Sequence, residues 1–264
     1  MASDIIKLSV QYVCKSFNVR GLNGGKGETV PVLRNVSFDV RQGEICSLIG
    51  ESGCGKTTLL RTIQGLQTLD SGAILVDGKS VTSPGRDRGF VFQQASLLPW
   101  RTARRNIDFG LELQGMSRAE RNRSVTRLLD LVGLGHAADQ YPHQLSGGMQ
   151  QRIGLARALA IDPAILLMDE PFSALDAQTR EDLQAELLRV HAETAKTTLF
   201  VTHDLDEAIY LSDRVVVLAA KPGRVKKILQ VPFGHPRPDL VELRGDPAFQ
   251  EIRAEMWSLI RKAA

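Results

Sequence analysis

Two hydrophobic periods alternate along the chain and predict its secondary structure. Residues 5–13 and 32–40 alternate apolar and polar side chains, which is typical of half-buried strands. Shorter apolar runs predict further strands at 45–49, 73–76, 89–92, 164–169, 198–202, 214–219 and 225–231. The glycine-rich stretch 20–27 predicts a flexible connection between the first two strands.

Helical signals fill the intervals between these strands. A helix is expected after residue 58, ending near Gly65, and others over 147–160, 177–194 and 204–211. The capping box Ser117–Glu120 opens a helix with apolar residues at helical spacing, which Gly133 closes. Strands alternating with helices predict a mostly parallel sheet with covered faces, and the helical block at 95–160 suggests a second lobe.

The last segment is proline-rich and then helical. Asp246 is a good N-cap, with Pro247 at the first helical position. The apolar stripe of this helix consists of Phe249, Ile252, Met256, Leu259 and Ile260. Because its polar face mixes Glu and Arg, we expect the stripe to pack on the parent domain in preference to a membrane surface.

Composition excludes several classes of protein. The chain has 264 residues, enough for one large domain or two lobes, and its net charge of +3 is too small to argue for nucleic acid. Its three cysteines are widely separated and lack metal-site spacing, which suits a reducing cytosol. No secretory signal and no apolar run of membrane-spanning length are visible, so we expect any membrane association to be peripheral.

The stretch Gly50–Thr58 fits G-x-x-x-x-G-K-[ST], the loop that cradles phosphates. An apolar strand precedes it and a helix follows, which is the context that the motif requires. Its glycines let successive N–H groups point at one anion. Lys56 supplies a charge for the β- and γ-phosphates, and Thr57 supplies a hydroxyl for Mg²⁺.

A second motif is the apolar strand that ends in Asp169 and Glu170. Ligands bind at the carboxyl ends of parallel strands. Asp169 is therefore placed to hold Mg²⁺, directly or through water, and Glu170 to orient and deprotonate the attacking water.

A third motif, Leu145-Ser146-Gly147-Gly148-Met149-Gln150-Gln151-Arg152, predicts a second anion site. Ser146 can cap the following helix, and the two glycines leave the backbone at its N-terminus exposed. This stretch resembles the signature of the ATP-binding-cassette (ABC) family, and it lies between the phosphate loop and the acidic strand as in that family. The resemblance covers essentially the whole chain.

The resemblance assigns roles to further residues. Gln93 matches the glutamine that senses Mg²⁺ and the nucleophilic water, and His203 matches the switch histidine that contacts the γ-phosphate. Asp176 lies in the segment that matches the loop contacting the opposite monomer. Phe17 matches the aromatic residue that stacks on adenine, although Tyr12 is close by and either ring could instead be core.

The expected site therefore has three groups of residues. The catalytic residues are Glu170, His203 and Gln93, and the Mg²⁺ ligands are Thr57, Gln93 and Asp169. The ATP-binding residues are Phe17, Gly50, Glu51, Ser52, Gly53, Cys54, Gly55, Lys56, Thr57, Thr58 and Asp176, with Ser146, Gly147 and Gly148 acting in trans from a second chain.

The family resemblance also implies a fold. It is an α/β fold, with a P-loop NTPase (RecA-like) core, an antiparallel β subdomain and an inserted α-helical subdomain. Residues 1–94 and 161–231 would form the nucleotide-binding core, 95–160 the helical signature subdomain and 232–264 a helical tail.

The implied function is ATP hydrolysis coupled to transmembrane transport, with ATP and Mg²⁺ as cofactors. The implied partners are a second ATPase chain in a head-to-tail dimer, two membrane permease subunits and, indirectly, an extracytoplasmic solute-binding protein. The expected location is the cytoplasmic face of a bacterial membrane.

Three segments resemble importers of the nitrate, aliphatic sulfonate and taurine group: Leu97–Trp100, Tyr141–Gln144 and Pro236–Asp239. The alternatives are an ABC ATPase of another transporter class or a soluble non-transport ABC ATPase. A tandem cassette, a long coiled-coil insertion and a basic nucleic-acid stripe are absent from the sequence. A GTPase would need an Asn-Lys-x-Asp guanine reader, which is also absent, and Glu170 argues against a nonenzymatic regulator.

Overall fold

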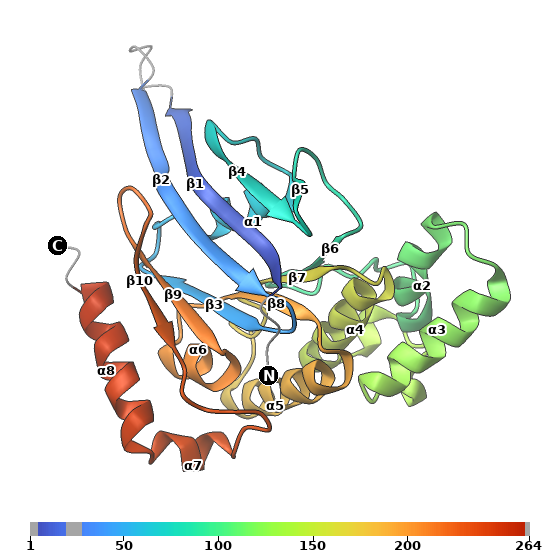
Figure 1. Cartoon of the computed structure of the whole chain (residues 1–264). Coiled ribbons are helices and arrows are strands. Elements are labelled where there is room, and N and C mark those ends of the chain that lie inside the picture. Colours follow the sequence, from blue (N-terminus) through green and yellow to red (C-terminus); the bar gives the residue numbers. More distant parts are fainter. Residues whose placement is uncertain (1–4, 20–27, 262–264) are drawn as a thin grey trace. The chain divides into compact units, whose positions relative to one another are not determined.

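The computed structural model describes residues 5–19 and 28–261, so the predicted connection at 20–27 lies outside the described residues. The chain divides into two compact units (Figure 1). One comprises the described parts of Met1–Gly85 and Thr197–Ala264, and the other comprises Arg86–Lys196.

The first unit contains four strands in the order β10-β9-β3-β8, namely β10 (Arg224–Gln230), β9 (Arg214–Ala219), β3 (Ile45–Gly50) and β8 (Thr197–Val201). β3 runs parallel to both β8 and β9, and β10 is antiparallel to β9. Every residue of β3 and β8 is buried, as expected for strands covered on both faces. The helices of this unit are α1 (Lys56–Gln64), α6 (Leu205–Leu211), α7 (Leu240–Arg244) and α8 (Pro247–Arg261).

The same unit carries a fully antiparallel sheet, in the order β2-β1-β4-β5. Its strands are β1 (Ile6–Val19), β2 (Glu28–Arg41), β4 (Ser71–Val76) and β5 (Lys79–Ser80). β1 and β2 form a long ribbon in Figure 1 and extend beyond the predicted 5–13 and 32–40. The prediction stopped short because the β1–β2 register shifts between Val10 and Lys15, which interrupts the period of two.

The second unit contains the parallel strands β6 (Arg88–Val91) and β7 (Ile165–Asp169), with Val91 opposite Met168. Its helices are α2 (Ala103–Leu113), α3 (Arg118–Leu131), α4 (Gly147–Ala160) and α5 (Ala177–Thr194), with 3-10 turns at Gly135–Ala137 and Pro142–Gln144. The capping box at Ser117 and Glu120 is present, and Gly133 has a φ of 67° just past the end of α3. Both features confirm the predicted limits of this helix.

The start of α2 was not predicted. The fully buried Asn106 donates hydrogen bonds to the carbonyls of Leu98, Arg101 and Thr102 and accepts one from the Leu98 amide. One amide side chain therefore satisfies the backbone groups of the turn that enters the helix.

The C-terminal helices pack on the first unit. α8 contacts α6, β9 and β10, and its Phe249 and Met256 are fully buried. The apolar stripe of α8 is thus directed at its parent unit, as predicted. Within the described residues, every helix is too short or too polar to cross a membrane.

Candidate nucleotide-binding site

The phosphate loop joins β3 to α1 in the first unit. Gly53 and Gly55 have φ values of 80° and 96°, in the left-handed region that favours glycine. Gly55 occupies the N-cap of α1 and has no side chain to accept from the first-turn amides, and that turn contains no acidic residue. The amides of the first turn and the positive end of the helix dipole are therefore available to an anion.

The loop is tightly packed on its inner side. A Cβ on Gly50 would lie 2.7 Å from Cys54 Sγ and from the Leu218 carbonyl, and a Cβ on Gly55 would lie 2.7 Å from Leu33 Cδ2. Cys54 itself is fully buried, and burial raises the pKa of its thiol. These contacts fix the backbone of the loop, so that its amides are preorganised for a ligand.

Lys56 is 7% exposed, and its Nζ donates to the carbonyls of Gly50, at 2.7 Å, and Glu51, at 3.3 Å. The loop's own carbonyls thus hold the ammonium group at its mouth. A phosphate can take over these bonds as a stronger, charged acceptor. Glu51, Ser52 and Thr57 are exposed and Thr58 is half-buried.

His203 follows β8, at the sheet edge from which the phosphate loop also emerges. β8 pairs with β3, placing Val201 opposite Leu48, and the Thr202 amide donates to the Leu48 carbonyl at 3.3 Å. Asp204 next caps α6 by accepting from the amides of Asp206 and Glu207. The exposed His203 is thus held between a strand end and a helix start, within the same unit as Lys56.

The second unit brings together Gln93 and the acidic pair. Gln93 follows β6, Asp169 ends β7 and Glu170 comes directly after it, so all three lie at the carboxyl edge of this parallel pair. Gln93 Nε2 donates to Ser173 Oγ at 3.0 Å, and Ser173 Oγ donates to the Glu170 carbonyl at 2.9 Å. Glu170 has a φ of 45°, which is unusual for a residue with a side chain and marks a position set by its surroundings.

Ser146 caps α4 as predicted, with Met149 N donating to Ser146 Oγ at 3.3 Å. The Ser146 and Gly147 positions are exposed, while Gly148 is buried. Gln150 fixes the approach to this helix by donating to the carbonyls of Pro142, at 2.9 Å, and Leu145, at 3.2 Å. The first turn of α4 is therefore a second preorganised, exposed helix N-terminus.

The start of α5 lies beside the start of α4 in the same unit. A Cβ on Gly148 would lie 2.8 Å from Thr179 Cγ2, and one on Gly147 would lie 3.4 Å from Leu175 Cδ2. Asp176 caps α5 by accepting from the Thr179 amide at 3.0 Å, and this hydrogen bond lowers the pKa of the Asp176 carboxyl. In this chain the Asp176 side chain thus serves its own helix, next to the glycines of the signature.

Neither aromatic ring near residue 17 belongs to the core. Phe17 is 37% exposed and Tyr12 is 72% exposed. Phe17 lies opposite Val30 in the β1–β2 ribbon, and Lys15 Nζ lies 5.4 Å from its ring centroid. Both rings are accessible to a planar ligand.

The proposed Mg²⁺ ligands are oxygens, which suit this hard cation. Thr57 offers a hydroxyl in the first unit, while Gln93 and Asp169 offer an amide and a carboxylate in the second. Within the described part of the chain, no cluster of three or more His, Cys, Asp or Glu side chains could hold a metal alone. Mg²⁺ does not require such a cluster, because that ion takes few protein ligands and completes its shell with phosphate oxygens and water.

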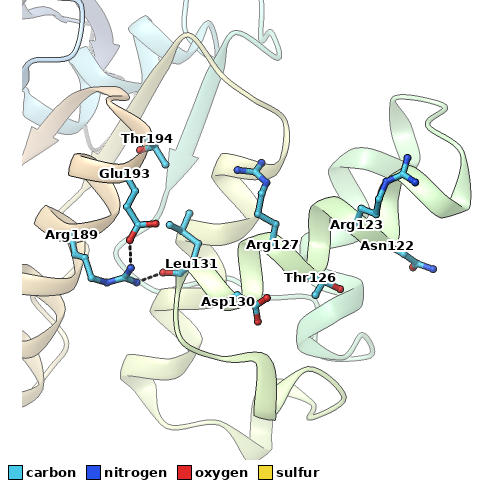
Figure 2. Close-up of a pocket in the computed structure, with 9 residues that line it drawn as sticks. All are labelled: Asn122, Arg123, Thr126, Arg127, Asp130, Leu131, Arg189, Glu193 and Thr194. Carbon is cyan, nitrogen blue, oxygen red and sulfur yellow. Dashed lines mark hydrogen bonds and ion pairs between the residues drawn. The ribbon is translucent and has the colours of Figure 1, made fainter.

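A large open cavity of the second unit is lined by none of these residues. Its volume is about 820 Å³, and residues of α3 and α5 line much of it (Figure 2). Arg189 donates to the Leu131 carbonyl and pairs with Glu193 there. The cavity contains no predicted site residue, and its size alone does not make it the site.

Two contacts were missing from the sequence prediction. Ser173 links Gln93 to Glu170, and Gly223, between β9 and β10, abuts the phosphate loop: a Cβ there would lie 2.2 Å from the Cys54 carbonyl. Ser173 lies only three residues after Glu170 in the sequence, so its contact with Glu170 could have been predicted from sequence spacing. The contact of Gly223 with the loop could not have been predicted in this way, because the pairing of strands distant in the sequence brings Gly223 to the loop.

The chain matches known proteins along most of its length. Residues 33–173 match the family model described as ABC transporter. An uncharacterized ABC transporter ATP-binding protein of Methanocaldococcus jannaschii is 48% identical over 97% of this chain and 92% of its own length.

The names of two relatives include a transported solute. The nitrate import ATP-binding protein NrtC of Synechococcus elongatus is 47% identical over 97% of this chain, which spans 38% of that protein. The taurine import ATP-binding protein TauB of a Jannaschia species is 43% identical over 90% of this chain and 88% of its own length.

Among solved structures, a dimeric ATP-binding cassette in a post-hydrolysis state, bound to ADP and Pi, aligns with a TM-score of 0.72. It is 33% identical, and the alignment covers 86% of this chain and all of that one. The α/β fold with its P-loop NTPase core is therefore as expected.

Proposed function

The chain belongs to the ABC transporter family, and we propose that it is the ATP-hydrolysing subunit of an importer for a small anionic solute of the nitrate, aliphatic sulfonate or taurine type. The observation that carries this proposal is the presence of two preorganised helix N-termini, α1 and α4, in one chain. A hydrolase that closes its site within one chain needs a single phosphate cradle. The second suits a site completed by another copy.

In the proposed mechanism the phosphate loop binds the triphosphate of ATP. The amides after Gly53 and Gly55 and the Lys56 ammonium neutralise the β- and γ-phosphates. Phe17 stacks on adenine. Mg²⁺ would be held by Thr57, Gln93 and Asp169 and would spread charge away from the γ-phosphate.

Hydrolysis then depends on residues at the sheet edges. Glu170 accepts the proton of the attacking water. His203 contacts the γ-phosphate. Gln93, held by Ser173 beside Glu170, positions the water and reports the state of the nucleotide to the membrane partner.

Two copies of the chain would form a head-to-tail homodimer. Each ATP would lie between the phosphate loop of one chain and Ser146, Gly147 and Gly148 of the other. ATP binding closes this dimer and product release opens it, a two-state element suited to driving a transporter. Asp176 lies beside the signature glycines, where it would support the contact between monomers.

The further partners would be two integral-membrane permease subunits and an extracytoplasmic solute-binding protein, with this ATPase on the cytoplasmic face of the membrane. The domain division proposed is a nucleotide-binding core at 1–94 and 161–231, a helical signature subdomain at 95–160 and a tail at 232–264. The relatives named for nitrate and taurine import support the solute class.

The test is reconstitution with the permease subunits that co-purify with this chain and with their solute-binding protein. We expect ATP hydrolysis in proteoliposomes to rise when the binding protein is loaded with nitrate, an aliphatic sulfonate or taurine. Stimulation by an unrelated sugar or amino acid, and by none of these anions, would refute the solute class. Failure of the chain to co-purify with any membrane subunit would refute the transport role.

A further inference from the structure

The C-terminal tail makes charged contacts at both ends of α6, the helix that begins two residues after His203. In its first turn, the Asp206 carboxylate forms ion pairs with Arg244 Nε of α7, at 3.0 Å, and with Arg253 Nε of α8, at 2.7 Å. At its other end, Arg237 donates to the carbonyl of Ser212, the C-cap, at 2.6 Å. The tail thus holds this short helix from two sides.

The tail also holds the strand that follows α6. His235 Nε2 lies 3.1 Å from Asp213 Oδ1, while Asp213 Oδ2 accepts from the Ile45 amide at the start of β3, at 2.9 Å. One carboxylate therefore joins the tail to the strand that leads to the phosphate loop. Hydrogen bonding to His235 and to the Ile45 amide lowers the pKa of Asp213 against the opposing effect of burial.

Apolar packing supports these polar contacts. Phe249 and Met256 of α8 are fully buried, and Leu240 and Leu243 of α7 are nearly so. Both helices contact α6. The orientation of α6 is therefore set by the tail as well as by β3.

His203 takes its position from the elements on either side. Before it, buried Thr202 is hydrogen-bonded to β3 through its amide and to the Asp204 amide through its Oγ1, at 3.0 Å. After it, Asp204 caps the helix, and Asp206 in the first turn forms ion pairs with both arginines of the tail. A movement of α6 would move the backbone of His203, because only one residue separates it from the helix.

We propose that Asp206, Arg244 and Arg253 are positioning residues, which hold α6 so that His203 is fixed at the sheet edge beside the phosphate loop. This inference rests on the proposed role of His203 in ATP hydrolysis. It gives the tail a part in turnover, in addition to packing. None of the three residues touches the nucleotide in this account, so their loss affects hydrolysis and leaves binding intact.

The test compares Asp206→Asn with Glu255→Gln. The first removes both tail ion pairs to α6 at nearly constant volume. The second removes the ion pair between Lys227 of β10 and Glu255 of α8, an equivalent attachment of the tail that does not involve α6. Steady-state ATP hydrolysis gives kcat and KM, and hydrogen–deuterium exchange of the backbone amides at 203–207 reports order around His203.

Asp206→Asn is expected to lower kcat about three- to tenfold with KM for ATP unchanged, and to speed exchange at 203–207. Asp206→Glu restores the charge and should recover most of kcat. Glu255→Gln should change neither quantity. Unchanged kcat in Asp206→Asn, or an equal loss in Glu255→Gln, would overturn the proposal.

A third variant distinguishes failure of the positioning role of the tail from failure of the proposed role of His203 in hydrolysis. His203→Ala should lose most hydrolysis while still binding ADP. If His203→Ala retains full turnover, the proposed role of His203 fails. If His203→Ala is impaired and Asp206→Asn is not, only the positioning role of the tail fails.

Discussion

Gly223→Ala is predicted to weaken nucleotide binding, although Gly223 belongs to the turn between β9 and β10. Its amide donates to the Val32 carbonyl at 2.8 Å, and its carbonyl accepts from the Arg34 amide at 2.9 Å. Both bonds tie the residue to β2. An added Cβ would lie 2.2 Å from the Cys54 carbonyl of the phosphate loop.

The size of the effect follows from this distance. The two atoms must separate by about 0.8 Å to reach the 3.0 Å below which real Cβ contacts are essentially never found. The two hydrogen bonds resist movement of residue 223, so the loop takes up much of the shift. Losing the optimal geometry of one charge-assisted hydrogen bond costs about 1.5–3 kcal/mol, which corresponds to a rise of about 10- to 150-fold in Kd.

Isothermal titration with ADP measures this directly, because ADP occupies the loop and is not hydrolysed. Gly234→Ala is the matched control, since a Cβ at Gly234 would meet nothing within 4 Å. Circular dichroism checks that both variants are folded, because overpacking also costs about 1–3 kcal/mol of stability. Wild-type affinity for ADP in folded Gly223→Ala would show that the turn does not brace the loop.

Three further substitutions separate binding from hydrolysis. Glu170→Gln should still bind ATP and accumulate a closed dimer, with turnover lowered by about a hundredfold or more; undiminished turnover would refute its role as base. Lys56→Ala should raise the Kd for ADP by at least about tenfold, measured by the same titration, and unchanged affinity would contradict the phosphate-loop assignment. Gln150→Leu should leave the Kd for ADP unchanged and lower kcat about three- to tenfold, because it frees the segment before Ser146; a change in the Kd alone would refute this.

Local signals in the sequence were sufficient for most of the secondary structure. Helices begin where capping residues predicted, as at Ser117 and Ser146, because a cap depends on neighbours within a few residues. The phosphate loop was equally recognisable, since its conformation is encoded by the glycines within it. The extent of β1 was not, because bulges conceal its alternation.

What the sequence did not reveal are contacts between segments distant along the chain. Gly223 reaches the Cys54 carbonyl only through the pairing of β9 with β3 and of β10 with β9. The stripe of α8 predicted packing, yet it did not predict that Arg253 would meet Asp206. Such pairs have no periodicity to detect, since each depends on the three-dimensional course of the chain.

In the proposed mechanism, each ATP site is completed by a second copy of the chain. Mixing Lys56→Ala chains with Ser146→Arg chains tests it, because neither variant alone has an intact site. Half of the randomly formed dimers would contain both variants, with one intact site of two, so the mixture should recover up to about a quarter of wild-type ATPase activity. A mixture no more active than the two separate variants would contradict the composite site.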